Sequence, residues 1–486
     1  MAFLAFLSVF SGDRGWRSGL WAVSLGSLLG ACGVTSASSP PPLAQDPWVK
    51  VYFNHNQSQS YQEPYRKIRR SGDDLEAVLV EAIQSAQSSV LVAVQELRLP
   101  GVAQALADRH RAGVQVQVVL ENDYSQPFSE LSPDAGAGPE GLESGGSESE
   151  DREQQRYREF VRLVDRDGDG QLSAAEVSQG DALVILDEAG VPRLDDTADG
   201  SKGSGLMHHK FVVIDGRTVV TGSANFTTSD VHGDFANPKN RGNANHLLVL
   251  ENPELAAIFT EEFRLLWGDG PGKRKNSRFG LQKPFRAPKN LTVGSTAVTI
   301  RFSPTPEKAG WAASSNGLIG KTLETAQRRA DLALFVFSEQ PLANILQTRH
   351  NAGVQVRALI DPAFAFRDYS EGLDLLGVTL GNKSCKVEAG NQPWAKAVTT
   401  VGVPRLAEGD KLHHKFGVVD GQRVITGSHN WSAAANHQND ETLLVLDNPT
   451  VAAHFTREFD RLYSDARLGL SKAAQAKVQE YQQRCG

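Results

Sequence analysis

The chain has 486 residues, a net charge of −7 at pH 7, three cysteines and two methionines. This length accommodates two α/β domains, the cysteine spacing matches no zinc site, and the composition gives no indication of an organic cofactor. The charge is uneven, because residues 121–200 carry 21 acidic and 6 basic side chains, which is a net −15 and leaves +8 for the rest of the chain.

The N-terminus has the pattern of an export signal. Two arginines precede a mostly apolar run over residues 19–30, which leads into Leu29-Gly30-Ala31-Cys32. The run is too short for a comfortable membrane span and resembles a bacterial lipoprotein signal. We predict a signal peptide over residues 1–31, a lipidated Cys32 and a tether over residues 32–47; a plain signal peptide or a misplaced start is the alternative. The exported protein is expected to be anchored through Cys32, or to be periplasmic or extracellular.

Residues 48–267 are predicted to form the first of two similar lobes. An apolar stripe that includes Leu75, Leu79 and Ile83 indicates an amphipathic helix, and Gly113 stands where a helix C-terminal cap belongs. Strands and helices alternate, which predicts α/β layers. The expected elements are a strand at Val49–Phe53, the helix near residues 75–83, a strand at Val90–Val94, a helix from Pro100, a strand at Val114–Leu120, a hairpin and a helix at Pro253–Trp267.

An insertion over residues 129–180 interrupts this lobe. It begins with an acidic, Gly/Ser-rich stretch that is typical of disorder. The segment Asp165–Glu176 then fits an EF-hand calcium loop at every diagnostic position, between a predicted entering helix and a short exiting helix. An Asp/Gly-rich surface turn is the alternative. The expected Ca²⁺ ligands are the carboxylates of Asp165, Asp167 and Asp169, the carbonyl of Gln171 and both oxygens of Glu176.

One residue pattern occurs twice, at a constant separation of 205 positions. The first copy contains His208, Lys210, Asp215, Ser223 and Asn225, and the second contains His413, Lys415, Asp420, Ser428 and Asn430.

Each copy predicts one half of a site. Residues two apart on a strand share a face, so His208 and Lys210 point one way. The neighbouring His209 and, in the second copy, His414 point to the opposite face and are expected to be core or surface residues without a role in the chemistry. Asp215-Gly216 is a hairpin signal, and Gly222 lets a ligand approach the backbone. Two halves make a cationic pocket with two imidazoles. This pocket suits a phosphodiester, where one imidazole attacks phosphorus and the other donates a proton.

The linker over residues 268–290 is basic, with seven Lys or Arg side chains against Asp269 in residues 267–290. Contact with an anionic lipid or nucleic-acid backbone and a merely solvated linker are equally good explanations. Residues 291–465 repeat the pattern of the first lobe, with a strand expected at Leu332–Phe337 and a last helix at Pro449–Tyr463, and residues 466–486 form a C-terminal tail. If Cys32 is the lipid anchor, Cys385 and Cys485 could pair, although nothing in their local sequence supports it.

Both copies match H-x-K-x4-D-x6-G-S-x-N in full, and the chain therefore resembles the phospholipase D superfamily. This resemblance implies two α/β lobes that share one site, a covalent phosphohistidine that water or an alcohol resolves, and no metal in the chemistry. The implied roles are nucleophile or general acid for His208 and His413, phosphate contact for Lys210, Lys415, Asn225 and Asn430, support for Ser223 and Ser428, and mainly turn formation for Asp215 and Asp420. His208 is favoured as the nucleophile.

The superfamily also places an acidic residue after each copy, where it orients a catalytic histidine. Glu441 follows the second copy, but Asn245 stands at the corresponding place after the first. An amide accepts a hydrogen bond but cannot stabilise an imidazolium by charge. The two histidines are therefore predicted to be inequivalent.

The leading hypothesis is an exported, monomeric phosphodiesterase that hydrolyses a phospholipid headgroup ester to phosphatidic acid. An exported nuclease with the same site is the first alternative, and a calcium-responsive binding protein without turnover is the second. A nuclease needs a basic, aromatic-lined channel, whereas a lipase needs an apolar rim at the mouth of the pocket. The residues that surround the site are therefore expected to distinguish a phospholipid substrate from a nucleic acid.

Overall fold

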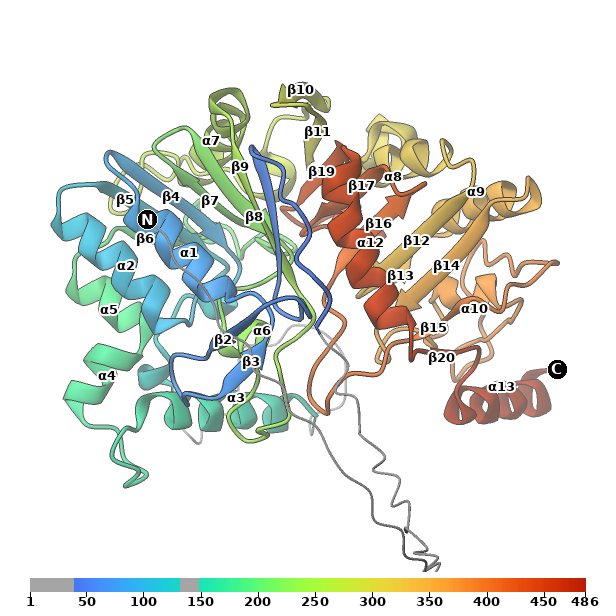
Figure 1. The fold of residues 1–486 in the computed structure, drawn as a ribbon, viewed down its shortest axis with the longest axis horizontal. Coiled ribbons are helices and arrows are strands. Elements are labelled where there is room, and N and C mark those ends of the chain that lie inside the picture. Colours follow the sequence, from blue (N-terminus) through green and yellow to red (C-terminus); the bar gives the residue numbers. More distant parts are fainter. Residues whose placement is uncertain (1–38, 132–147) are drawn as a thin grey trace, which may run out of the picture. The chain divides into compact units, whose positions relative to one another are not determined.

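The computed structural model describes residues 39–131 and 148–486, and Pro40–Gly486 form one compact unit (Figure 1). The predicted signal peptide, Cys32 and most of the acidic stretch before the calcium loop lie outside the described residues. Within the described part of the chain, no helix is long and apolar enough to cross a membrane.

The first lobe is built on a seven-stranded mixed sheet with the strand order β1-β9-β8-β7-β4-β5-β6. Neighbouring strands pair in parallel at β4–β5 and β5–β6, and the other neighbours in this sheet pair antiparallel. The strands of this lobe are β1 Val49–Phe53, β2 Ser60–Gln62, β3 Arg69–Ser71, β4 Ser89–Val94, β5 Gln115–Leu120, β6 Arg193–Asp195, β7 Lys210–Ile214, β8 Thr218–Gly222 and β9 His246–Glu251. Its helices are α1 Leu75–Gln84, α2 Pro100–Arg111, α3 Glu148–Val164, α4 Ala174–Gly180, α5 Ala182–Glu188, α6 Thr228–Val231 and α7 Pro253–Trp267.

The second lobe repeats this order with two added edge strands, as β10-β11-β19-β17-β16-β12-β14-β15-β20. Its strands are β10 Lys289–Val293, β11 Thr296–Phe302, β12 Arg329–Leu334, β13 Phe337–Ser338, β14 Gln355–Ile360, β15 Val401–Val403, β16 Lys415–Val419, β17 Arg423–Gly427, β18 Trp431–Ser432, β19 Thr442–Asp447 and β20 Arg467–Leu468. Its helices are α8 Ser315–Leu323, α9 Gln340–Asn351, α10 Glu371–Leu375, α11 Ala433–His437, α12 Pro449–Tyr463 and α13 Lys472–Cys485. The predicted α/β fold, repeated in two halves, is confirmed.

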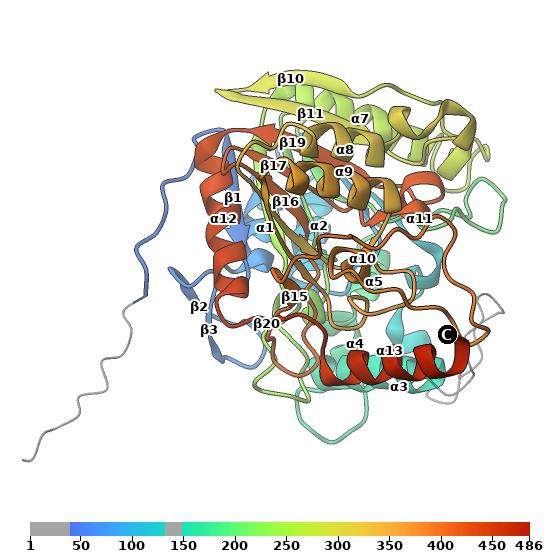
Figure 2. The same ribbon diagram turned by 90° about the vertical axis from the view of Figure 1, so that its right-hand side faces the viewer.

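Helices cover both faces of each sheet. The outer helices are α1, α2 and α5 on the first lobe and α8 and α9 on the second, where Figure 2 shows them in front of the sheet. Helix α12 packs on the inner side, against β1 of the first lobe as well as β16 and β17 of its own lobe (Figure 1). One buried apolar cluster contains Phe53 and Phe211 together with Phe416 and Phe455 of the second lobe. The lobes therefore share a core, which fixes the two halves of the site against each other.

Local sequence signals explain the two motif hairpins. Asp215 and Gly216 both have positive φ, 51° and 59°, as do Asp420 and Gly421, and this conformation joins β7 to β8 and β16 to β17 with the twist that antiparallel strands require. Gly113, with φ of 87°, follows the end of α2 as predicted.

One predicted strand of the second lobe begins and ends three residues earlier than its sequence suggests. Residues 332–337 were expected to form one strand, but β12 ends at Leu334, and Phe337 belongs to the short strand β13, which pairs with β18. The amide of Phe335 still donates to the carbonyl of His414 (2.8 Å). After that bond the chain leaves the sheet, which places Phe335 at the edge where the motif histidines lie.

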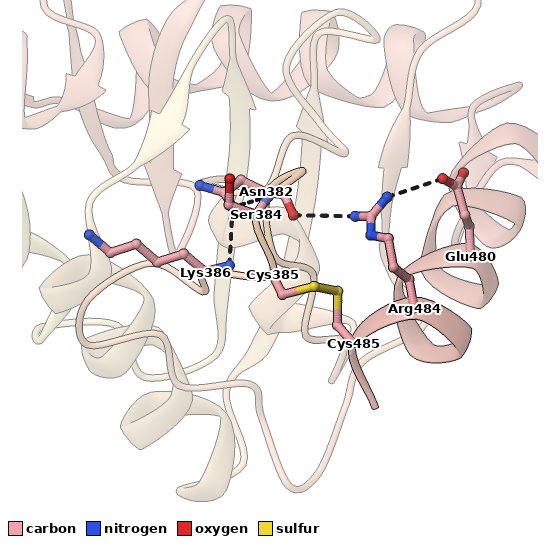
Figure 3. The surroundings of a disulfide bond; sticks show 7 residues. All are labelled: Asn382, Ser384, Cys385, Lys386, Glu480, Arg484 and Cys485. Carbon is pink, nitrogen blue, oxygen red and sulfur yellow. Dashed lines mark hydrogen bonds and ion pairs between the residues drawn. A yellow bond between two sulfur atoms is a disulfide. The ribbon is translucent and has the colours of Figure 1, made fainter.

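A disulfide joins Cys385 to Cys485 across 100 positions and holds the end of α13 to the second lobe (Figure 3). The local sequence gave no support for this pairing. Arg484 adds a hydrogen bond to the carbonyl of Asn382 (3.3 Å). Helix α13 buries only Ala474, so the disulfide is the main link between this helix and the lobe.

Replacing both cysteines, Cys385 and Cys485, by serine is expected to lower the free energy of unfolding by about 2–4 kcal/mol, because the unfolded chain regains the freedom that the cross-link removes. Thermal unfolding without reductant measures this change. Limited proteolysis should then cut within α13 first. Unchanged stability together with an uncut helix would show that other contacts suffice to hold α13.

Candidate active site

The two motif copies meet at the boundary between the lobes, and each is tied to the opposite lobe by backbone hydrogen bonds. The amide of His208 donates to the carbonyl of Asp440 (3.0 Å), and the amide of His413 donates to the carbonyl of Ala244 (3.1 Å). Both contacts form short parallel bridges. Each histidine is therefore positioned by the segment that follows the other lobe's motif.

The His208 side chain is paired with a carboxylate from the second lobe. Its Nδ1 lies 2.7 Å from Oε2 of Glu441, which also accepts a hydrogen bond from the Ser428 hydroxyl (2.6 Å). Glu441 is fully buried. A carboxylate at Nδ1 holds the proton there and leaves the lone pair on Nε2, so His208 has the tautomer that a nucleophile needs.

The His413 side chain has a neutral partner instead. Its Nδ1 lies 3.0 Å from Oδ1 of Asn245, which also accepts from the Ser223 hydroxyl (2.7 Å). The tautomer is the same, but the partner supplies no negative charge. The predicted inequivalence of the two histidines is present in the structure, and it arises from contacts that cross between the lobes.

Two buried lysines stand beside these histidines. Lys210 Nζ donates to the carbonyl of His208 (3.0 Å) and to Oε1 of Gln95 (3.3 Å), and Lys415 Nζ donates to the carbonyl of His413 (2.7 Å). Burial lowers the pKa of Lys210 to about 8. Burial and the charge of Lys210 hold the pKa of Lys415 well below its usual range.

The same environment lowers the pKa values of the histidines. Burial and then the lysine charges lower the pKa of His208 and of His413 well below 6.5. A phosphate anion between the lysines would offset this mutual repulsion, because a nearby negative charge favours the charged form of each group. The electrostatics of the pocket therefore suit an anionic substrate.

The motif asparagines keep part of their hydrogen-bonding capacity unused. Oδ1 of Asn225 and of Asn430 is buried with no hydrogen-bond partner among the described residues. The backbone amide of Asn225 donates a hydrogen bond to Oδ2 of Asp230 (2.8 Å), which fixes the position of this residue. The fold leaves these two side-chain oxygens without a hydrogen bond among the described residues, which suits a role in ligand contact.

The motif aspartates lie away from the site. Asp215 accepts hydrogen bonds from the amides of residues 87–89, and Asp420 accepts from the amides of residues 327–329. Each stands at the hairpin end of its strand, opposite to the motif lysine. They are turn residues, as their sequence context indicated.

The motif glycines do not serve ligand approach, and this expectation was wrong. A Cβ on Gly222 would lie 2.1 Å from the carbonyl oxygen of His246, and one on Gly427 would lie 2.2 Å from that of Thr442. Glycine is required because β8 and β17 pass close to the backbone of the next strand.

The second histidine of each pair is structural, as predicted. His209 contacts the Thr442 hydroxyl through Nδ1 (2.9 Å) and Glu262 through Nε2 (3.0 Å). His414 contacts Glu458 (3.0 Å) in the same way. Both rings are fully buried.

The residues around the two motif copies differ between the lobes. On the second lobe the Phe335 ring lies 5.0 Å from the His413 ring and 4.7 Å from Phe364. Gln95 takes the corresponding place on the first lobe. Its backbone amide donates to the carbonyl of His209 (3.0 Å), as the backbone amide of Phe335 donates to that of His414. Near Gln95, burial raises the pKa of Glu121 to about 8, with further contributions from neighbouring aspartates. Sequence reasoning missed these residues because they belong to no motif.

The basic linker is neither fully solvated nor fully available to an anion. Lys283 is buried, with its Nζ 2.5 Å from Glu262 and 2.6 Å from Asp440, and Arg286 also pairs with Glu262. The linker thus connects α7 to the segment that positions His208. Its exposed basic residues are Lys273, Arg274, Lys275, Arg278 and Lys289.

Three of the five predicted Ca²⁺ ligands converge in the loop over residues 165–176. Asp165, Asp167 and Asp169 each offer a carboxylate oxygen within 4.8 Å of the others. Gly170 has φ of 79°, which the sharp turn requires. Glu176 turns back into the loop, where Oε1 accepts from the amide of residue 166 (2.7 Å). This oxygen-rich donor set fits a hard cation such as Ca²⁺.

Comparison with known proteins identifies the domain type. The family model of the cardiolipin synthase PLD-like domain matches residues 79–267 and 319–463. Mitochondrial cardiolipin hydrolase of Xenopus tropicalis is 31% identical over 140 residues, which cover 29% of this chain and 57% of that protein. Its Homo sapiens counterpart is 28% identical over 145 residues, or 29% of this chain and 48% of that protein. The chain spans about half the length of the curated relatives it matches.

The fold likeness extends over nearly the whole chain. The crystal structure of phosphatidylserine synthase from Haemophilus influenzae Rd KW20 superposes with a TM-score of 0.53 and 12% identity, covering 91% of this chain and 94% of that one. At this identity the likeness concerns the fold alone. The family model matches well over half of the residues, in two segments that each contain one motif copy. The chain therefore belongs to the PLD-like domain family, a phosphodiesterase family, and contains that domain twice.

Proposed function

We propose that this protein hydrolyses the headgroup ester of a phospholipid to phosphatidic acid, with His208 as the nucleophile. The observation that carries this proposal is the pairing of His208 with the buried carboxylate of Glu441 beside two buried lysines. Glu441 fixes the nucleophilic tautomer, and Lys210 and Lys415 stabilise the negative charge of the phosphoryl group in the transition state.

The reaction has two steps. Nε2 of His208 attacks phosphorus, and the bond to the headgroup oxygen breaks while the imidazolium of His413 gives its Nε2 proton to that oxygen. The phosphatidyl group is then covalently bound to His208. Water, deprotonated by His413, attacks phosphorus, the P–N bond breaks, and phosphatidic acid leaves with both histidines restored. No metal takes part in this sequence.

The walls of the pocket favour a lipid over a nucleic acid. Phe335 and Phe364 are half-buried beside His413 and offer an apolar rim. On the opposite side burial raises the pKa of Glu121, and the nearby carboxylates of Asp123 and Asp196 raise it further. Asp123 is exposed, and its negative charge repels a polyanionic strand but accommodates the single phosphate of a lipid. The curated relatives named above are cardiolipin hydrolases, which is consistent with this choice.

The decisive experiment is product formation by soluble protein that begins after Cys32, in EDTA. Phosphatidylcholine/phosphatidylglycerol vesicles and single-stranded DNA are offered in parallel, with His413→Ala as the blank. Phosphatidic acid that disappears in the blank supports the proposal. Cut DNA with intact lipid would replace it with the nuclease, and no product from either substrate, with or without calcium, would leave a binding protein without turnover.

We further propose that the protein is exported and acts as a monomer. The disulfide between Cys385 and Cys485 supports export, because such bonds persist in oxidising compartments. The lipoprotein-type signal then places the anchor on Cys32. If so, Cys32→Ser should move the protein from the membrane fraction to the soluble fraction; an unchanged distribution would contradict lipid anchoring.

Ca²⁺ is proposed to bind the loop through Asp165, Asp167, Asp169, Gln171 and Glu176 and to order the insertion. Helix α3, which leads into this loop, is attached to the lobe by an ion pair between Arg156 and Glu96. Glu96 follows the end of β4, so Ca²⁺ binding would also restrict the motion of the chain at that end of the strand.

Calorimetric titration of EDTA-treated protein is expected to show one Ca²⁺ bound, with a Kd of about 10⁻⁵–10⁻³ M for a loop without a partner loop. Asp167→Ala removes one ligand and should weaken binding at least about tenfold. Asp108→Ala, an exposed carboxylate elsewhere in the first lobe, is the matched control. Equal titrations for both variants would show that the loop is only a surface turn.

A further inference from the structure

One buried carboxylate from each lobe lies beside a motif histidine, but the two come from different positions in their lobes. The second lobe contributes Glu441, and its counterpart in the first lobe is Asn245. The first lobe contributes Asp230, which is 3% exposed. The residue 205 positions further along is Ala435. The acid that the first lobe lacks at Asn245 is therefore present fifteen residues earlier, at a place where the second lobe has none.

The carboxylate of Asp230 is aimed at His413. Its Oδ1 lies 3.8 Å from Nδ1 of His413 and accepts a hydrogen bond from the Asn243 side chain (2.5 Å). The orientation of that amide is fixed, because its own oxygen accepts from the backbone of Lys411 (2.8 Å). Asn243 therefore holds the Asp230 oxygen beside the imidazole.

Asp230 has no competing cation in direct contact. Its ion-pair contact among the described residues is with His413, and its other oxygen accepts from the amide of Asn225. Its charge also opposes the lowering of the pKa values of Lys210 and Lys415 that burial causes. A buried carboxylate is retained at such a site only if a partner charge compensates for its desolvation.

We propose that Asp230 is a positioning residue that stabilises the imidazolium of His413, in place of the glutamate missing at Asn245. Asn245 supplies the hydrogen bond to Nδ1, and Asp230 supplies the negative charge, so two residues together do for His413 what Glu441 does for His208. This inference rests on the proposed function, in which His413 donates a proton to the leaving group and later takes one from water.

The competing explanation is purely structural. Asp230 lies in α6, where its amide is capped by the Thr227 hydroxyl (3.2 Å) and its carboxylate holds Asn225. A structural role predicts that removing Asp230 impairs every substrate alike. A charge acting through His413 predicts a loss that depends on whether the leaving group needs a proton.

The test compares Asp230→Ala with the double variant Asp230→Ala/Asn245→Glu, which moves the carboxylate to the position that Glu441 occupies in the other lobe. Phosphatidylcholine vesicles supply a leaving group that needs a proton, and bis(p-nitrophenyl) phosphate supplies one that does not. The burst of nitrophenolate reports the first step alone. Asp230→Asn carries the same comparison if the alanine variant does not fold, as judged by circular dichroism.

Asp230→Ala is expected to lower lipid turnover about 10–100-fold but to slow the nitrophenolate burst less than about threefold. Adding Asn245→Glu to Asp230→Ala should raise lipid turnover at least tenfold above that of Asp230→Ala alone. Equal losses on both substrates, no rescue, or no loss at all would overturn the role of Asp230. If the natural sequence turns over neither substrate, the proposed function itself has failed, which is a separate outcome.

Discussion

Replacing His208 by asparagine is expected to lower phosphatidic acid formation by about 10⁴-fold or more, with little change in the free energy of unfolding. Asparagine can still donate a hydrogen bond to Glu441, but it has no ring nitrogen to form the P–N bond. Headgroup release from phosphatidylcholine vesicles measures the loss, at equal concentrations of folded protein.

The adjacent residue provides the control. His209→Gln should keep turnover per folded molecule within about threefold but lower the free energy of unfolding by about 1–3 kcal/mol, because His209 bonds to Thr442 and Glu262 in the core. A loss of turnover in the His208 variant and a loss of stability in the His209 variant would show that the first residue acts in the chemistry and the second in folding. Substantial turnover by the His208 variant would remove that residue from the role of nucleophile.

Replacing Lys283 by methionine is expected to lower the free energy of unfolding by about 3–5 kcal/mol, because it leaves buried carboxylates without their shared cation. The ammonium lies 2.5 Å from Glu262 and 2.6 Å from Asp440 and also donates to the carbonyl of Ser303 (2.8 Å). Glu262 keeps Arg286 as a partner, whereas Asp440 keeps only backbone donors. Urea unfolding at pH 7 measures the difference. Lys273→Met, on the exposed part of the same linker, should change stability by less than about 0.5 kcal/mol.

The pH dependence of this loss has a definite sign. Burial opposes the charge of Lys283, but Asp440 and Glu262 raise its pKa above 10.5. Its stabilisation is therefore present below pH 10.5 and is lost as the pH rises through the raised value. Burial likewise opposes the charge of Glu262, but Lys283 and His209 hold its pKa below 4.5. That contribution is present above pH 4.5 and is lost as the pH falls. The two proteins should thus differ most between about pH 5 and 10; a constant difference would show that the loss is one of packing.

The regular elements and the motif residues could be predicted because their signals are local. Pro253–Trp267 and Pro449–Tyr463 have helical caps and apolar stripes in the sequence itself, and both helices have those bounds in the structure. The hairpin at Asp215-Gly216 needs only the positive φ that these residues tolerate. In each case the determining residues lie within one turn of helix or hairpin of one another.

The contacts that distinguish the two histidines are not local. Glu441 follows the second motif but pairs with the histidine of the first, 233 positions away. The basic residues of the linker were equally consistent with contact to anions and with a solvated linker. Lys283 instead turns inward, because Glu262 and Asp440 meet at that point from different lobes. Asp230 belongs to no motif at all. These features depend on the packing of one lobe on the other, which residue spacing along the chain does not encode.

The crossed contacts also have a consequence for how such a protein can diversify. If two identical halves associated, every residue would appear twice, and a substitution that tuned one histidine would alter the other. Here both halves lie on one chain, so Asn245 and Asp230 can change on one side while Glu441 and Ala435 remain on the other. Because the two halves are joined in one chain, the site need not be symmetric, and the two imidazoles can acquire different partners and different roles.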